Sequence, residues 1–194
     1  MQRIYMDANA TTPLLPEVYE AMRPFWIEHF GNASSIHQHG QHARAAVDHA
    51  RDVIARLLHC RTSEIVFTSG GTESDNLALF GLVQPGDHLI TSSIEHHAIL
   101  HAAEKLRDRG AEVTFLPVSA EGVVNPQDVR RAIQPNTKLI SIMMANNETG
   151  AIQPVSEIGR IAADADIYFH TDAVQAAGKL PKIGRASCRE RVCR

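Results

Sequence analysis

The chain has 194 residues, of which 44% are hydrophobic, and its formal net charge is −3. This size and apolar content suit one globular domain with a hydrophobic core, and they exclude a disordered or fibrous chain. Acidic and basic residues are interspersed, and no stretch approaches the ~20 apolar residues that would cross a bilayer, so we expect a soluble cytoplasmic protein without nucleic-acid or membrane partners.

Short runs rich in valine, isoleucine and phenylalanine alternate along the chain with longer segments of helical period. In chain order, the predicted elements are a strand at 4–7, helices at 16–29 and 41–59, a strand at 64–68, a helix at 73–83, a strand at 88–92, a helix at 97–109, a strand at 112–117, a helix at 126–133, a strand at 138–144, a helix at 156–163 and a strand at 167–170. Pro16 and Pro126 stand at predicted helix starts, and Gly110 stands where a left-handed cap would end a helix. The alternation predicts an α/β fold of three layers, with helices on both faces of a mostly parallel sheet.

Ligands of such sheets bind beyond the carboxyl ends of the strands, so the loops that follow the strands are the candidate sites. Gly70, Gly71 and Thr72 follow the strand predicted at 64–68 and open the next helix. The glycines would let a ligand approach the backbone, and the free N–H groups of the helix start favour an anion such as phosphate. A tight turn capped by Ser or Thr is an equally good interpretation of this loop.

The loop after the strand at 88–92 carries histidines that open the next helix. An imidazole at that position, such as His96, can stack on a heteroaromatic ring and can transfer protons. His97 and His101 lie one helical turn apart, but no third ligand stands at a suitable spacing. We therefore expect these two to be helix-surface or packing residues and expect no metal site.

Two further loops carry side chains suited to a pyridine ring. Asn146 follows the strand at 138–144, where its amide could donate to a phenolic oxygen or could cap its own loop. Asp172 and Gln175 follow the last strand. An aspartate there can keep a pyridine nitrogen protonated through a charge-assisted hydrogen bond, or it can cap a following helix.

These four loops, together with residues 7–12 and 31–37, resemble the cysteine desulfurases of the class V aminotransferase group, which are fold-type I enzymes dependent on pyridoxal 5'-phosphate (PLP). The resemblance extends from residue 2 to about residue 181. It implies that Gly71 and Thr72 hold the cofactor phosphate, that His96 stacks on the pyridine ring and assists proton transfer, that Asn146 bonds the hydroxyl side of the ring, that Asp172 pairs with the pyridine nitrogen, and that Gln175 contacts the phenolic oxygen.

The resemblance also implies a reaction. L-cysteine would be converted to L-alanine and an enzyme persulfide, whose sulfur passes to iron–sulfur cluster or thio-cofactor assembly. A homodimer and a sulfur-acceptor or scaffold protein would be the partners. The lysine that binds the cofactor covalently, the nucleophilic cysteine and the substrate-binding arginine lie further downstream in the family, and neither Cys60 nor Lys179 matches them. We therefore expect an N-terminal fragment that is inactive alone.

Within this interpretation, residues 1–15 belong to an incomplete small domain and residues 16–182 to an incomplete PLP-binding large domain. Residues 183–194 depart from the family pattern and resemble the translation of a sequencing adapter, so they are expected to be a non-native tail. The alternatives are a selenocysteine lyase or another class V enzyme, and a non-catalytic module that retains the fold. The presence of His96, Asp172 and Gln175 together argues against the non-catalytic module.

Overall fold

The computed structural model describes residues 4–180 and divides the chain after Ile65 into two compact units. The predicted small-domain segment 1–15 falls within the first unit, and its assignment stays a prediction. The predicted tail, 183–194, lies outside the described residues. Between residues 4 and 180, no helix combines the length and the apolar character needed to span a membrane.

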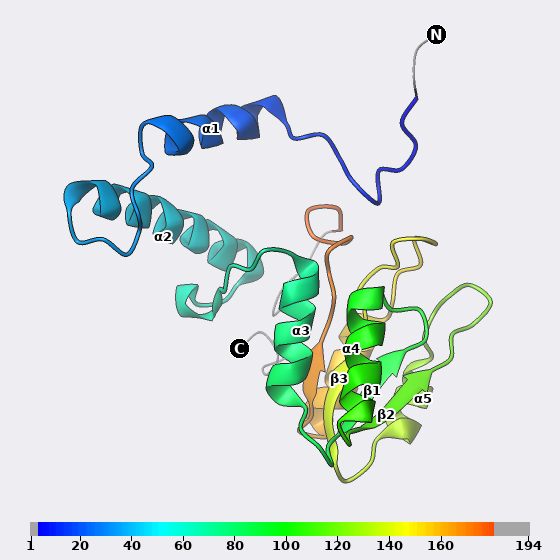
Figure 1. Cartoon of the computed structure of the whole chain (residues 1–194). Coiled ribbons are helices and arrows are strands. Elements are labelled where there is room, and N and C mark those ends of the chain that lie inside the picture. The colour runs from blue at the N-terminus through cyan, green and yellow to red at the C-terminus, as the bar shows by residue number, and fades with distance from the viewer. Residues whose placement is uncertain (1–3, 181–194) are drawn as a thin grey trace. The chain divides into compact units, whose positions relative to one another are not determined.

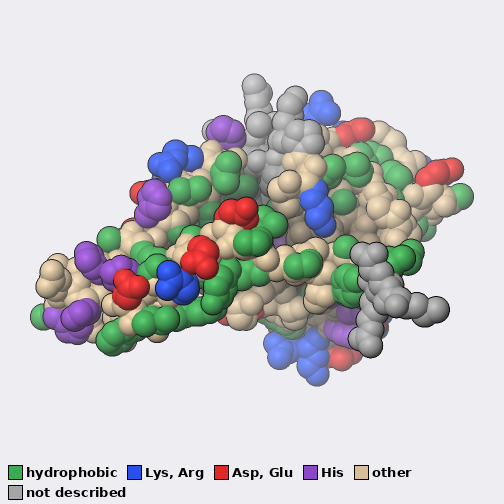
Figure 2. Space-filling view, turned by 90° about the horizontal axis from the view of Figure 1, so that it is seen from above, with side chains coloured by type: hydrophobic (Ala, Val, Ile, Leu, Met, Phe, Trp, Pro, Cys, Tyr) green, Lys and Arg blue, Asp and Glu red, His purple; other side chains and the backbone are tan. Residues whose placement is uncertain are grey.

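The first unit contains α1 (Pro16–Ile27), α2 (Gln38–Leu58) and the short 3-10 helix η1 (Thr62–Glu64). Proline at the first position of α1 is confirmed. No residue of α1 is buried, and α2 buries only Gly40 and Ala55. Large apolar side chains such as Trp26 and Phe30 are 61% and 71% exposed, and hydrophobic side chains are visible on the molecular surface in Figure 2. The helices of this unit therefore have apolar surface that they do not cover by themselves.

The second unit is built on a four-stranded parallel sheet in the order β2-β1-β3-β4 (Figure 1). The strands are β1 (His88–Ser92), β2 (Glu112–Leu116), β3 (Thr137–Ser141) and β4 (Tyr168–His170). The helices of this unit are α3 (Gly71–Leu82), α4 (His97–Asp108), α5 (Pro126–Ala132) and α6 (Val155–Asp164). The left-handed φ of +97° at Gly110 confirms the cap predicted after α4.

Alternate residues of the central strands belong to two separate hydrophobic cores, one on each face of the sheet. Leu89 and Leu139 pack with Leu79 of α3 and Ile99 of α4 on one face of the sheet. Their chain neighbours Ile90 and Ile140 pack on the other face with residues of α5 and α6, including Val129 and Ile158. Because successive side chains of a strand point to opposite faces, this alternation produces the predicted three-layer α/β architecture.

Two predicted strands are wrong: residues 4–7 and 65–68 have no regular structure, and Glu64 belongs to η1. Val66 and Phe67 are 68% and 46% exposed. A strand requires a neighbour for its backbone hydrogen bonds, and no strand of the described region pairs with either segment. The apolar pattern alone does not reveal whether such a neighbour exists.

Other elements differ from prediction only at their ends. Helix α2 starts at Gln38 because the His37 ring accepts a hydrogen bond from the Gly40 N–H. Strand β3 ends at Ser141 rather than Met144. Beyond that end, the N–H groups of Ile142 and Met144 still donate to the carbonyl oxygens of His170 and Asp172. The chain therefore stays parallel to β4 up to the loop that carries Asn146.

Candidate functional site

The N-terminus of α3 is open to a ligand. The helix begins at Gly71, its N-cap residue is Gly70, and no side chain caps it. The cap by Ser or Thr that the sequence also allowed is therefore not formed. A methyl group at Gly70 would meet no atom within 4 Å. Unpaired N–H groups at the positive end of a helix dipole are suited to bind an anion.

The loop before this helix is held in place by Glu73. Its Oε2 accepts hydrogen bonds of 2.6 Å from both the Oγ and the N–H of Ser69. These two bonds lower the pKa of the Glu73 carboxyl. Glu73 therefore fixes the loop from the side while the end of the helix stays uncapped.

His96 is the N-cap residue of α4, and its Nδ1 accepts a hydrogen bond of 3.1 Å from the Ala98 N–H. The preceding residue, Glu95, is 5% exposed and accepts a 2.6 Å bond from Ser92 Oγ and bonds of 2.9 and 3.1 Å from the Met143 N–H. Burial raises the pKa of Glu95 to about 7, although these hydrogen bonds oppose the shift. Glu95 therefore joins the His96 loop to the end of β3.

Asn146 is buried and uses its amide within the protein. Its Nδ2 donates to the Ile94 carbonyl at 2.8 Å, and its Oδ1 accepts from the N–H groups of Glu148 and Thr149. The self-capping loop that the sequence allowed is thus formed, with an added tie to the loop before His96. Contact between Asn146 and a cofactor stays a prediction.

Asp172 lies in the irregular segment that follows β4, and Gln175 lies in the turns after that segment. Asp172 Oδ1 accepts a hydrogen bond of 2.9 Å from the Val174 N–H, so the carboxylate caps this turn. Gln175 Oε1 accepts a bond of 2.7 Å from Lys179 Nζ. The capping role that the sequence offered for Asp172 is therefore real, but the capped segment is a run of turns rather than a helix.

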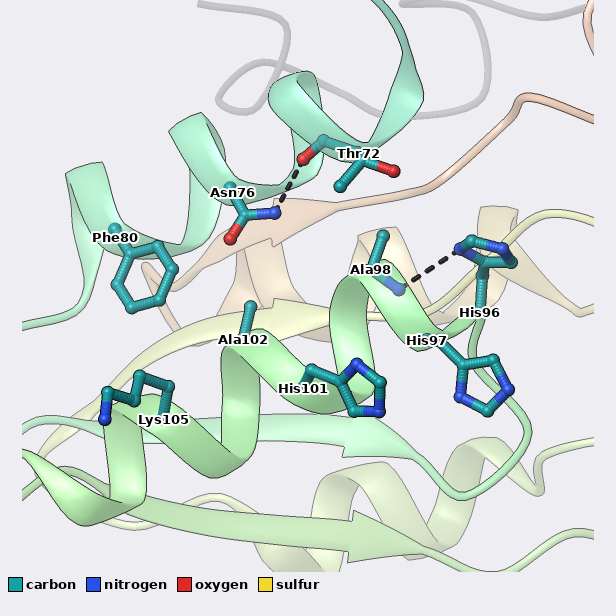
Figure 3. A pocket seen from close by; sticks show the side chains of 9 residues that line it. All are labelled: Thr72, Asn76, Phe80, His96, His97, Ala98, His101, Ala102 and Lys105. Atoms are coloured by element: carbon teal, nitrogen blue, oxygen red, sulfur yellow. Dashed lines mark hydrogen bonds between the residues drawn. The ribbon is translucent and has the colours of Figure 1, made fainter.

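The structure brings the predicted site residues Gly71, Thr72, His96 and Asp172 to the carboxyl ends of the strands, whereas the side chain of Asn146 bonds to Ile94 and that of Gln175 to Lys179. A methyl group at Gly71 would lie 2.8 Å from Val174 Cγ2, so the start of α3 touches the turn that Asp172 caps. Thr72 and His96 line one groove between α3 and α4, with a volume of about 490 Å³ (Figure 3). This edge is where parallel α/β sheets bind their ligands.

The same groove shows what the other two histidines do. Asn76 and Phe80 of α3 point toward Ala102 of α4, while the exposed rings of His97 and His101 stack with centroids 5.2 Å apart (Figure 3). Both are helix-surface residues, as expected. Between residues 4 and 180, no group of three or more His, Cys, Asp or Glu side chains is placed to hold a metal ion.

Beside Asp172 lie two ionisable residues that sequence reasoning missed. Asp75 of α3 is 4% exposed, and its Oδ1 lies 3.6 Å from His170 Nε2. His170 Nδ1 is in hydrogen-bonding contact with Ser141 Oγ at 2.9 Å. Burial raises the pKa of Asp75 to about 7, with Asp172 adding to the shift. Burial also lowers the pKa of His170 to about 4 against the opposing effect of Asp172.

A sequence signal for Asp75 existed. It stands four residues before Leu79 in α3, and both residues are buried. An acidic residue on the apolar stripe of a helix is unusual and indicates a buried polar contact. Glu95 had no comparable signal, because its burial depends on how the loop folds back onto β3.

Comparison with known proteins gives the family. The family described as aminotransferase class V matches residues 4–183. Over 184 residues the chain is 52% identical to a protein named cysteine desulfurase IscS from Dictyoglomus turgidum, covering 93% of this chain and 47% of the relative. Over 182 residues it is 54% identical to a protein of the same name from Methanosarcina thermophila, covering 92% and 45%.

Solved structures agree with this assignment. A structure described as SspA in complex with cysteine has a TM-score of 0.90 and 43% identity, covering 94% of this chain and 54% of that one. A structure described as a NifS-like protein has a TM-score of 0.88 and 38% identity, covering 93% and 51%. The chain spans about half the length of these relatives. It belongs to the class V aminotransferase family.

Proposed function

We propose that this chain carries the cofactor-binding part of a PLP-dependent cysteine desulfurase. The complete enzyme would convert L-cysteine to L-alanine and keep the sulfur as a persulfide on one of its own cysteines. Identity of 52% and 54% to proteins named cysteine desulfurase supports this activity. The observation that carries the proposal is the meeting of an uncapped helix N-terminus with the Asp172 turn at the carboxyl edge of the sheet.

The chemistry of this edge fits PLP. The open start of α3, with Gly71 and the Thr72 hydroxyl, suits a phosphate. The Asp172 carboxylate suits a protonated pyridine nitrogen, and the His96 ring, which lines the groove between α3 and α4 together with Thr72, suits a flat aromatic partner. When bound, PLP supplies the electron sink that lets bonds of an amino-acid substrate break. The protein's part is to bind, orient and charge-balance that group.

Asn146 and Gln175 would complete the contacts on the phenolic side of the ring. The Asn146 Nδ2 donates to Ile94 and lies 3.5 Å from Met143 Sδ. A ring contact would replace the weak bond to sulfur and keep the one to the backbone. Gln175 would exchange its bond from Lys179 for a contact with the cofactor.

We further propose that the complete protein is a cytoplasmic homodimer that passes sulfur to an acceptor or scaffold protein for iron–sulfur cluster or thio-cofactor assembly. The covalent lysine, the nucleophilic cysteine and the substrate arginine would come from sequence beyond this chain. Lys179 pairs with Gln175, and Cys60 lies in the first unit. Neither is proposed as catalytic, so the chain alone should not turn over cysteine.

The test compares the complete enzyme with this chain. Each is incubated with PLP and L-cysteine, alanine is quantified, and the persulfide is located by mass spectrometry. We expect both products from the complete enzyme and neither from the chain. Turnover of L-selenocysteine but not L-cysteine would instead identify a selenocysteine lyase. Borohydride reduction that leaves a stoichiometric pyridoxyl group on Lys179, with alanine produced by the chain, would overturn the assignment of the lysine to missing sequence.

A further inference from the structure

Three carboxylates and one histidine form a cluster inside the second unit. Asp75 comes from α3, Glu95 from the loop before α4, and His170 and Asp172 from the end of β4 and the loop after it. Asp172 acts electrostatically on Asp75, on Glu95 and on His170. Within residues 4–180, no ion pair joins any of these carboxylates to a lysine or an arginine. The cluster therefore has no permanent positive charge to balance several carboxylates.

The carboxylates of the cluster differ in their hydrogen bonds. Asp172 accepts a bond from the Val174 N–H, and Glu95 accepts bonds from Ser92 Oγ and the Met143 N–H. Such bonds favour the charged form of a carboxylate. The neighbour of Asp75 is the His170 ring at 3.6 Å, which is too long for a strong hydrogen bond. Asp75 is therefore the carboxyl group of the cluster that has least to stabilise a negative charge.

His170 completes a pair with Asp75. Its ring bridges Ser141 Oγ on β3 and the Asp75 carboxyl on α3. The pair has no net charge when the acidic proton is on the Asp75 carboxyl and the His170 ring is neutral. It also has no net charge when the proton is on the ring and Asp75 is a carboxylate. A buried pair without net charge avoids the desolvation penalty of an isolated ion and leaves the negative charge beside it on Asp172.

We propose that Asp75 and His170 are positioning residues for Asp172: as a pair they carry no net charge in the cofactor-free protein, and they release one proton to solvent when a cationic ring nitrogen pairs with Asp172. This inference rests on the proposed function, because it concerns the carboxylate assigned to the pyridine nitrogen. Its physical basis is that burial keeps Asp75 protonated with help from the negative charge of Asp172, and a cation on Asp172 cancels that second contribution. Burial raises the pKa of Asp75 to about 7, so the effect falls near neutral pH.

The experiment measures proton release when PLP binds to the cofactor-free complete enzyme. Calorimetric titrations at pH 6.5 in buffers of different ionisation enthalpy give the number of protons exchanged. Protons from groups that Asp75 does not influence cancel in the difference between wild type and Asp75→Asn. We expect wild type to release about half a proton more than this variant. Asp108→Asn, an exposed acid-to-amide change at the end of α4, is the matched control and should match wild type.

Affinity supplies the second readout. We expect wild type and Asp75→Asn to bind PLP within about threefold of each other at pH 6, where Asp75 is protonated, and wild type to gain up to about tenfold over the variant by pH 8.5. Equal proton release in the two proteins would overturn the inference. So would an affinity of wild type that gains nothing over the variant between pH 6 and pH 8.5, because proton release on binding requires the affinity to rise with pH.

A measurement on wild type alone covers the case in which Asp75→Asn does not fold. Infrared difference spectra on adding PLP should show loss of a protonated carboxyl band, and no loss would overturn the inference. The proposed function fails separately: it is wrong if wild type binds PLP with this proton release but makes no alanine from cysteine.

Discussion

At the scale of single residues, Asp172 is the group on which the proposed chemistry depends most. Replacing it with Ala in the complete enzyme should lower cysteine turnover by about 100-fold or more, since it removes a preorganised charge from the reacting centre. The same change should leave the fold intact, because the Val174 N–H lies in an exposed turn where water can replace the lost cap. Alanine production and the far-ultraviolet circular dichroism spectrum measure the two effects, with the exposed Asp164→Ala as the control. Near-normal turnover would remove Asp172 from the pyridine-nitrogen role.

Asp75 also makes the stability of the fold depend on pH. Its pKa is raised from 3.8 to about 7 in the folded protein. An acid whose folded pKa is raised stabilises the fold fully below its unfolded pKa, and this contribution is lost as the pH rises through the folded value. Urea unfolding of the cofactor-free complete protein should therefore show the Asp75→Asn variant gaining about 1 kcal/mol over wild type between pH 6 and pH 8. A pH-independent difference would show that Asp75 does not titrate in this range.

His170 acts with the opposite sign. Its pKa is lowered from 6.5 to about 4 by burial, so the neutral ring stabilises the fold above pH 6.5 and that contribution is lost as the pH falls toward 4. Below pH 6 the losses from His170 offset the gains from Asp75. The two effects are therefore best separated above pH 6.5, where His170 is already neutral in both states.

At the scale of elements, the start of α3 depends on close approach to the turn after β4. A methyl group at Gly71 would lie 2.8 Å from Val174 Cγ2, which is too close, so one of the two must move. Gly71→Ala should weaken PLP binding by about tenfold, because a shift of the helix start misplaces the N–H groups that face the phosphate. Fluorescence titration of the complete enzyme measures this effect.

Two further variants identify the cause. Val174→Ala removes the methyl group that clashes, so the double variant Gly71→Ala, Val174→Ala should recover most of the lost affinity. Gly81→Ala lies in the same helix with open space around its Cβ. It should leave PLP affinity unchanged and raise stability by about 0.5–1 kcal/mol through helix propensity. If the double variant binds as weakly as Gly71→Ala alone, the clash is not the reason.

At the scale of the whole molecule, exposed apolar surface decides how the chain behaves alone. In the first unit, Trp26, Ile27, Phe30 and Leu57 are each more than 60% exposed. Apolar surface of this kind is normally covered by other protein. We therefore expect the isolated chain to self-associate or to behave as a loosely packed globule, binding a hydrophobic dye strongly. A monodisperse monomer in light scattering, with a sharp cooperative melt, would contradict this.

The sequence by itself determined the layered core of the second unit. The periodicity of its apolar residues predicted the four strands and the helices between them. A strand that is buried on both faces needs apolar residues along its length, and these are evident in the sequence. Proline and glycine marked helix ends correctly at Pro16, Pro126 and Gly110, since backbone geometry there is a local property. The four polar loops and their order were enough to indicate the class V aminotransferase family, which matches residues 4–183.

The tertiary structure alone decided the properties that depend on partners distant in the sequence. Segments 4–7 and 65–68 have strand-like sequences, but no strand within residues 4–180 pairs with them, so they are irregular. Asn146 has an amide suited to a ligand, and only the fold shows that this amide also donates to the Ile94 carbonyl. The burial of Asp75 and Glu95 next to Asp172 could not be read from spacing, because it arises where α3, the loop before α4 and the end of β4 meet. Their protonation results from burial and from the charges of neighbouring carboxylates, and both depend on the tertiary structure rather than on the local sequence.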